Sequence, residues 1–124
     1  MRDPSSPTCR TISTLLSRIG DKWTVLVVQT LGDGSKRFNE LRREIPSVSQ
    51  RMLTLTLRNL ERDGLVSRTV TPSIPPRVDY ALTDLGHSLQ GPICALSQWA
   101  LDNVAEIHAS QARYDMLQEE KDAA

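Results

Sequence analysis

Two amphipathic segments separated by three residues, 46–48, constrain the fold of this chain more than any other feature. The segments 36–45 and 49–63 each repeat apolar residues at the spacing of one helix face. Those residues are Phe38, Leu41 and Ile45 upstream and Leu53, Leu57 and Leu60 downstream. A proline ends the first helix, Ser49 can cap the second, and Gly64 can end it. The pattern predicts a helix-turn-helix.

The chain after this motif changes from helical periodicity to alternation. Apolar and polar residues alternate over 65–71 and again over 77–82, which indicates two strands. The loop between them, PSIPP at 72–76, is too rich in proline to enter a sheet interior. The sequence therefore predicts a winged helix-turn-helix, a mainly α fold with a small β-hairpin wing.

Two helices are predicted before the motif. The first, 9–19, has an apolar stripe, and we expect Gly20 to end it in the left-handed conformation. The second, 22–31, is rich in β-branched residues. Its length and the Gly-Asp-Gly stop at 32–34 favour a buried helix over a strand.

One long helix is predicted after the hairpin, with Thr83 as its cap and a kink at Gly91-Pro92. Its apolar stripe comprises Leu85, Leu89, Ile93, Leu96, Ala100, Val104 and Ile107. The pattern fades near Gln111. We therefore expect a flexible N-terminus over 1–8, one domain over 9–110, and a frayed acidic tail over 111–124.

Charge is distributed unevenly, although the formal net charge is zero. Residues 34–83 contain nine basic and five acidic residues, a net charge of +4. Residues 84–124 contain two basic and seven acidic residues, a net charge of −5. A basic middle and an acidic end predict one surface that faces an anion and another surface with a different role.

The second helix of the motif carries an outer face without an acid. Arg51, Thr54, Leu55 and Arg58 point away from its leucines at about 100° per residue. The second helix of a helix-turn-helix lies in the DNA major groove with its N-terminal residues nearest the bases. Arginine pairs with guanine, glutamine with adenine, and an apolar side chain with the thymine methyl. The residues predicted to read bases are Ser49, Gln50, Arg51, Thr54, Leu55 and Arg58.

Other basic residues are predicted to hold the DNA backbone, which positions a protein without reading sequence. They are Lys36 and Arg37 at the start of the first helix of the motif, Arg42 and Arg43 further along it, and Arg77 at the wing. Two readings of the fold stay open at this point. One is a double-stranded DNA-binding protein, and the other is a winged helix that binds protein without reading DNA.

Several classes of protein are disfavoured by what the sequence lacks. Paired carboxylates, a nucleophile elbow, a phosphate loop and metal-ligand spacing are absent, so we expect neither an enzyme nor a cofactor or metal. The longest apolar run, VLVV, is too short to span a membrane, and the N-terminus has no signal peptide. Two cysteines make no disulfide framework, so a cytoplasmic location is expected.

The chain resembles the HxlR branch of bacterial winged-helix transcriptional regulators, close to the MarR group. The matching segments are IGDKWT at 19–24, RFNELRREIPSVSQRMLTLTLRNLERDGLVSRTV at 37–70, PPRVDYALTDLGHSL at 75–89, and Trp99. The order and spacing of these segments make the resemblance specific. It departs from the usual pattern at Leu55, where a polar residue is common, and at Thr71, where an aromatic is common.

The resemblance implies a homodimeric, sequence-specific transcriptional regulator. Its dimers form through the N-terminal and C-terminal helices, so that two reading helices face a pseudo-palindromic operator. Some members respond to electrophiles or oxidants through a cysteine just before the first helix, and Cys9 matches that position. A thiol at a helix start beside Arg10 is a reasonable redox site, but an inert thiol fits equally well.

The remaining cysteine, the histidines and the tryptophans are expected to have structural roles. Cys94 is expected to be a buried apolar residue, and His87 and His108 to lie on the surface. Trp23 and Trp99 are expected in the core, while a pocket between dimerisation helices would suit an aromatic effector.

Overall fold

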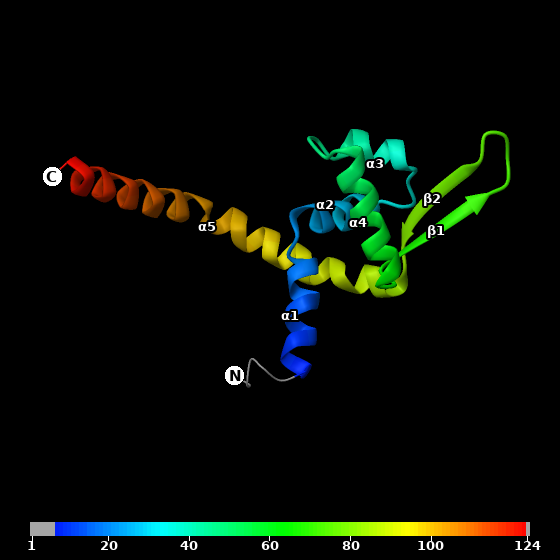
Figure 1. Cartoon of the computed structure of the whole chain (residues 1–124), viewed down its shortest axis with the longest axis horizontal. Coiled ribbons are helices and arrows are strands. Elements are labelled where there is room, and N and C mark those ends of the chain that lie inside the picture. Colours follow the sequence, from blue (N-terminus) through cyan, green and yellow to red (C-terminus); the bar gives the residue numbers. More distant parts are fainter. Residues whose placement is uncertain (1–6, 124) are drawn as a thin grey trace. The chain divides into compact units, whose positions relative to one another are not determined.

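The computed structural model describes residues 7–123 of the protein, which form five helices and a two-stranded antiparallel sheet (Figure 1). The elements are α1 (Pro7–Ile19), α2 (Lys22–Leu31), α3 (Phe38–Glu44), α4 (Gln50–Arg62), β1 (Val66–Thr71), β2 (Arg77–Leu82) and α5 (Asp84–Ala123). The predicted winged helix-turn-helix, mainly α with a small hairpin wing, is confirmed. The chain divides into two compact units, residues 1–91 and 92–124.

The core of the first unit lies between α2, α3, α4 and the start of the hairpin. Its buried apolar residues are Val27, Val28, Leu31, Leu41, Ile45, Val48, Leu53, Leu57, Leu60, Leu65, Val66 and Leu82. The three leucines predicted on the inner face of α4 are at most 2% exposed. The prediction of a helix at 22–31 is confirmed. Asp21 helps to start it, because its carboxylate accepts hydrogen bonds from the backbone N–H groups of Trp23 and Thr24.

Both ends of α4 are capped as the sequence predicts. The Ser49 Oγ accepts a hydrogen bond from the Met52 N–H at 3.0 Å. At the other end, Gly64 has a φ of 78°. The Leu65 N–H donates to the Leu60 carbonyl at 2.9 Å, and the Gly64 N–H donates to the Glu61 carbonyl at 3.0 Å. This pair of bonds is a Schellman motif, which needs a left-handed residue at its centre.

Thr83 links the end of α4, the hairpin and the start of α5. Its Oγ1 donates to the Gly64 carbonyl at 2.6 Å and accepts from the Gly86 N–H at 3.1 Å. Its own N–H donates to the Leu65 carbonyl at 3.1 Å. A Cβ at Gly86 would collide with that same carbonyl oxygen, so only glycine fits this contact. The prediction that Thr83 caps the last helix is confirmed.

Helix α1 begins two residues earlier than predicted. It starts at Pro7, so Pro7 and Thr8 are helical rather than flexible, and residues 1–6 of the predicted N-terminal segment lie outside the described residues. The prediction for Gly20 is wrong, because positive φ values among residues 7–123 occur only at Gly34, Ser47 and Gly64. The Gly20 N–H instead donates to the Leu16 carbonyl and continues the helical hydrogen-bonding pattern.

Helix α5 continues where a frayed tail was predicted. It remains helical from Asp84 to Ala123, so the prediction of fraying after Gln111 is wrong. Polar and apolar residues alternate after Gln111, so the helical spacing was not recognised there. The apolar side chains of the helix nevertheless continue through Tyr114 and Leu117. The boundary between the two units falls between Gly91 and Pro92. That is the position of the predicted kink, which itself stays a prediction.

Two predictions of burial are also wrong. Cys94 is exposed, and Trp99 is 58% exposed. Trp23 is half-buried. The sequence pattern shows that Cys94 and Trp99 lie on an amphipathic helix, but it does not distinguish a core within one chain from a surface that another molecule covers.

Candidate nucleic-acid interface

The outer face of α4 forms a shallow concave surface, which we call the α4 face. It has a volume of about 560 Å³ and is lined by Gln50, Arg51, Thr54, Leu55 and Arg58. These are five of the six residues that the sequence assigned to base reading. None of them is acidic, and Leu55 is 50% exposed. The helix geometry therefore brings two guanidinium groups, an amide and an apolar side chain onto one surface.

The predicted base-reading side chains differ in whether they form hydrogen bonds within α4. The Thr54 Oγ1 donates to the Gln50 carbonyl at 2.8 Å, and the sixth predicted residue, Ser49, serves as the N-cap. By contrast, Arg51 and Arg58 are exposed, and neither forms an ion pair with any residue between 7 and 123. Two unpaired cations at the surface favour an anionic partner.

The predicted backbone-binding residues on α3 divide into two groups. Arg42 and Arg43 lie in its last turn, where they are exposed and form no ion pair within the described chain. Lys36 does not begin α3, contrary to prediction. It forms an isolated bridge with Tyr80 and its Nζ lies 3.1 Å from the Glu44 carboxylate, so it is already partly neutralised. Arg37 is the N-cap residue of α3 and is exposed.

Arg77 stands at the start of β2 with a carboxylate beside it. Its Nε donates to the Asp79 Oδ2 at 2.9 Å, and its side chain is 52% exposed. The cation of the wing is thus paired within the hairpin. Its electrostatic contribution to an anionic partner is smaller than that of Arg51 or Arg58.

Arg68 was not predicted, and the structure places it next to the α4 face. A hollow of about 330 Å³ between α4 and the hairpin is lined by Thr54, Arg58, Arg68 and Tyr80, together with Leu57 and Glu61. Arg68 lies opposite Tyr80 in the sheet register and forms no ion pair among residues 7–123. Alternation along β1 puts Arg68 on the same side as the buried Val66, and this alternation is a sequence signal that could have placed Arg68 beside α4.

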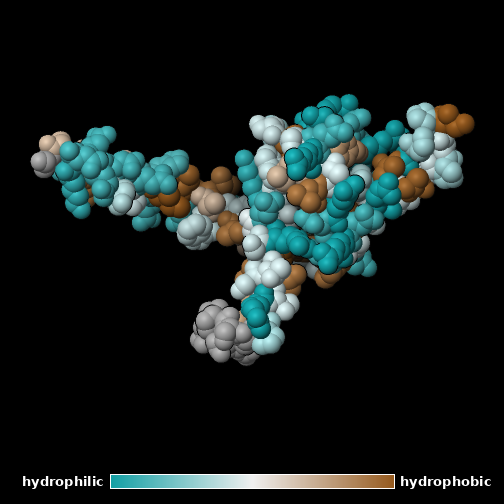
Figure 2. Space-filling view, in the orientation of Figure 1, coloured by the Kyte–Doolittle hydropathy of each residue, from teal (hydrophilic) through white to brown (hydrophobic). Residues whose placement is uncertain are grey.

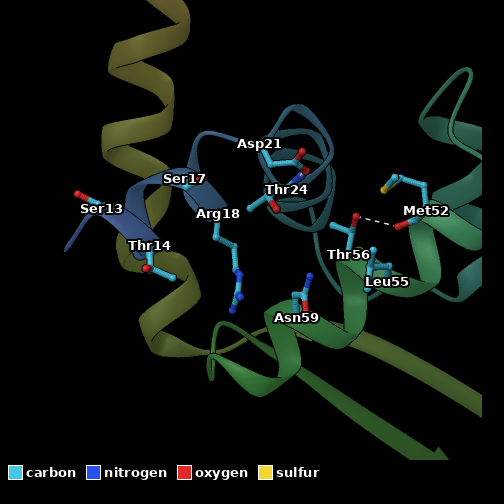
Figure 3. A pocket seen from close by; sticks show the side chains of 10 residues that line it. All are labelled: Ser13, Thr14, Ser17, Arg18, Asp21, Thr24, Met52, Leu55, Thr56 and Asn59. Atoms are coloured by element: carbon cyan, nitrogen blue, oxygen red, sulfur yellow. Dashed lines mark hydrogen bonds between the residues drawn. The ribbon is translucent and has the colours of Figure 1, made fainter. Parts of the chain in front are cut away.

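A second groove lies beside the α4 face, between α1, the start of α2 and α4 (Figure 3). It has a volume of about 610 Å³, and it is lined by Ser13, Thr14, Ser17, Arg18, Asp21, Thr24, Met52, Leu55, Thr56 and Asn59. Leu55 belongs to both surfaces. The Arg18 Nη1 lies 2.7 and 2.8 Å from the two Asp63 oxygens, which ties α1 to the end of α4. Half of its lining residues carry hydroxyl groups, and its acid, Asp21, caps α2.

Other kinds of site find no support in residues 7–123. No group of three or more His, Cys, Asp or Glu side chains lies close enough to hold a metal ion. None of the helices described is long and apolar enough to cross a membrane. Cys9 lies in the first turn of α1, is half-buried, and is a thiol rather than part of a disulfide.

Comparisons with known proteins agree with this geometry. The HxlR-like helix-turn-helix family matches residues 18–108. YdeP of Bacillus subtilis (strain 168), described as an HTH-type transcriptional regulator, is 40% identical over 109 residues, which cover 86% of this chain and 85% of YdeP.

Two solved structures extend the comparison to the fold. The transcriptional regulator YtfH from Salmonella typhimurium has a TM-score of 0.76 and 34% identity, covering 89% of this chain and 95% of that one. The redox regulator HypR in its reduced form has a TM-score of 0.74 and 41% identity, covering 80% and 98%. The chain therefore belongs to the HxlR-like helix-turn-helix family, whose members are DNA-binding transcriptional regulators rather than enzymes.

Proposed function

We propose that α4 reads base edges in the major groove of double-stranded DNA. The observation that carries this proposal is the α4 face, an acid-free surface with two unpaired guanidinium groups beside Gln50 and Leu55. Arg51 lies in the first turn of α4, where recognition helices come closest to the bases. Its guanidinium group can donate two hydrogen bonds to the O6 and N7 acceptors of guanine. Leu55 offers an apolar contact to a thymine methyl.

The exposed arginines around α4 hold the DNA backbone in this proposal. They are Arg37, Arg42, Arg43, Arg68 and Arg77. Arg68 shares a hollow with Arg58, so one phosphate group placed there would meet two guanidinium groups and the single carboxylate of Glu61. Lys36 contributes less, because its side chain is 15% exposed and paired with Glu44.

The working form of the protein in this proposal is a homodimer on a pseudo-palindromic operator. Helix α1 exposes Ile12, Leu15 and Leu16, and residues 92–124 expose a long apolar set. That set is Leu96, Trp99, Leu101, Val104, Ile107, Tyr114, Met116 and Leu117. Exposed apolar patches of this extent mark interaction sites. A second copy would present a second α4 about one turn of DNA, roughly 34 Å, from the first.

Cys9 is the proposed point of redox or electrophile response. Support comes from its place in the first turn of α1 and from the similarity to HypR, a redox regulator. Two Cys9 thiols, one from each copy, would lose two electrons and two protons to hydrogen peroxide, giving one disulfide and two waters. Cys9→Ser should then bind its operator equally with and without peroxide, whereas the parent protein should change its affinity.

The proposed function is tested by selecting duplexes from a random pool and titrating salt. We expect the selected sites to contain inverted repeats, and log affinity to fall linearly with log salt concentration as phosphate-bound cations are released. Affinity that does not change with salt, or a pool without enrichment, would reject DNA reading by α4. Repeating the selection after peroxide treatment tests Cys9 in the same design.

A further inference from the structure

The far end of the wing carries an apolar side chain that the fold does not use. Ile74 is 102% exposed, and Figure 2 shows hydrophobic atoms at the far end of the hairpin. Its neighbours Pro72, Pro75 and Pro76 have no backbone N–H to donate. The segment 72–76 carries no charged side chain. Apart from Ser73, the tip therefore offers a partner only apolar side chains.

The tip is also ordered before it meets a partner. The Ser73 Oγ donates to the Pro75 carbonyl at 2.8 Å and lies 3.5 Å from the Thr71 carbonyl. Prolines restrict the backbone on both sides of Ile74. A tip held in this way loses little conformational entropy when it binds.

The charge around the tip favours nucleic acid as the partner. No acidic residue occurs between Asp63 and Asp79, while Arg68 and Arg77 both lie on the hairpin. Asp79 itself is paired with Arg77. Strand β1 and the tip can therefore approach a polyanion without a repelling carboxylate.

The length of the hairpin matches the distance to the next groove. Strand β1 follows α4 almost directly, and its six residues span roughly 20 Å at about 3.3 Å per residue. The minor groove lies half a turn, about 17 Å, from the major groove centre. A minor groove about 6 Å wide admits a side chain but not a helix.

We infer that Ile74 enters the minor groove beside the major groove read by α4, as an apolar wedge that prefers A·T pairs. Apolar wedges of this kind insert between base steps in minor-groove proteins. The preference follows from the guanine amino group, which projects into the minor groove and would lose its water partners under an isoleucine. This inference rests on the proposed reading of DNA by α4.

The first test compares Ile74→Ala with Val70→Ala on the selected operator. Ile74 contacts nothing in the fold, so its loss should leave the protein folded. We expect Ile74→Ala to bind about five- to tenfold more weakly with an unchanged salt slope, because an apolar contact releases no cations. Val70, which is 50% exposed but lies short of the tip, should change affinity less than twofold when replaced by alanine.

The second test changes the DNA instead. Hydroxyl-radical footprinting locates the minor-groove patch that the parent protein protects and Ile74→Ala does not. Replacing A·T by G·C there should weaken the parent about five- to tenfold, and replacing guanine by inosine, which lacks the amino group, should restore binding. Ile74→Ala should respond to neither change.

Three outcomes overturn the inference separately from the proposed function. Equal binding by the parent and Ile74→Ala, equal losses from Ile74→Ala and Val70→Ala, or no rescue by inosine would each remove Ile74 from the minor groove while leaving DNA reading by α4 intact. A parent protein that bound no duplex at all would reject both.

Discussion

The two faces of α4 use the same residue type for different purposes. Leu57 is 2% exposed in the core, whereas Leu55, two positions earlier on the helix, is 50% exposed on the α4 face. Under the proposed function, the inner face determines whether the helix-turn-helix folds, and the outer face determines what it binds. If this division is correct, substitutions on the two faces should change different measurements.

Leu57→Ala should reduce the free energy of unfolding by about 2–5 kcal/mol, because it removes a buried side chain and leaves a cavity. Urea denaturation followed by circular dichroism measures this change. Without urea, at a temperature at which the variant is folded, its operator affinity should match that of the parent. A stability loss below about 1 kcal/mol would mean that the inner face is less tightly packed than its burial indicates.

Arg51→Ala should weaken operator binding by about 1–3 kcal/mol and relax the base preference at one position. Its stability should change by no more than about 0.5 kcal/mol, since the side chain is exposed. Arg62→Ala, an arginine at the end of the same helix and outside the α4 face, is the control. Equal losses from both substitutions would show general charge attraction rather than base reading.

Gly64→Ala should cost about 1–2 kcal/mol of stability, because alanine must adopt a left-handed conformation at a φ of 78°. No atom lies within 4 Å of the added Cβ, so the cost is purely conformational. Gly91→Ala is the matched control. It also has open space, but it lies inside α5 without a positive φ, so it should stabilise by up to about 1 kcal/mol.

Arg42→Ala should weaken binding to selected and random duplexes alike. The loss of one phosphate contact should reduce the slope of log affinity against log salt by about 1. Lys36→Ala should reduce it less, because Glu44 already pairs with that lysine. A larger slope change for Lys36 would show that this ion pair opens on DNA.

Leu55→Ala should change stability by no more than about 0.5 kcal/mol, because its side chain is half exposed. Its binding should weaken only on sites with thymine opposite Leu55, and replacing that thymine by uracil, which lacks the methyl group, should remove the difference. A loss of several kcal/mol in stability would place Leu55 in the core and erase the distinction between the two faces.

Local patterns were sufficient to predict most of the fold. The leucine spacing of α4, the Ser49 cap, the Gly64 stop and the alternating strands each depend on residues close together in the chain, so sequence reasoning found them. The five side chains of the α4 face followed from one helix and its periodicity. Their contact with DNA stays a prediction.

Features that depend on distant residues were missed or misplaced. Lys36 pairs with Tyr80 across the first unit, so it lies outside α3 although it directly precedes a helical pattern. Arg68 lies next to the α4 face because the hairpin packs beside α4. Trp99 is exposed because residues 92–124 carry apolar side chains that their own chain does not cover. Local periodicity gives the side of β1 on which Arg68 lies, but it gives none of these long-range contacts.

The Thr83 hydroxyl bonds to the Gly64 carbonyl just after α4 and to the Gly86 N–H in the first turn of α5. The Thr83 backbone N–H donates to the carbonyl of Leu65, just before β1. Helix α4, the hairpin and the first turn of α5 are thus all hydrogen-bonded through Thr83 and should move together as one rigid unit. In the proposed homodimer, an effector would therefore change operator affinity by altering the spacing between the two α4 helices, and not by bending either of them.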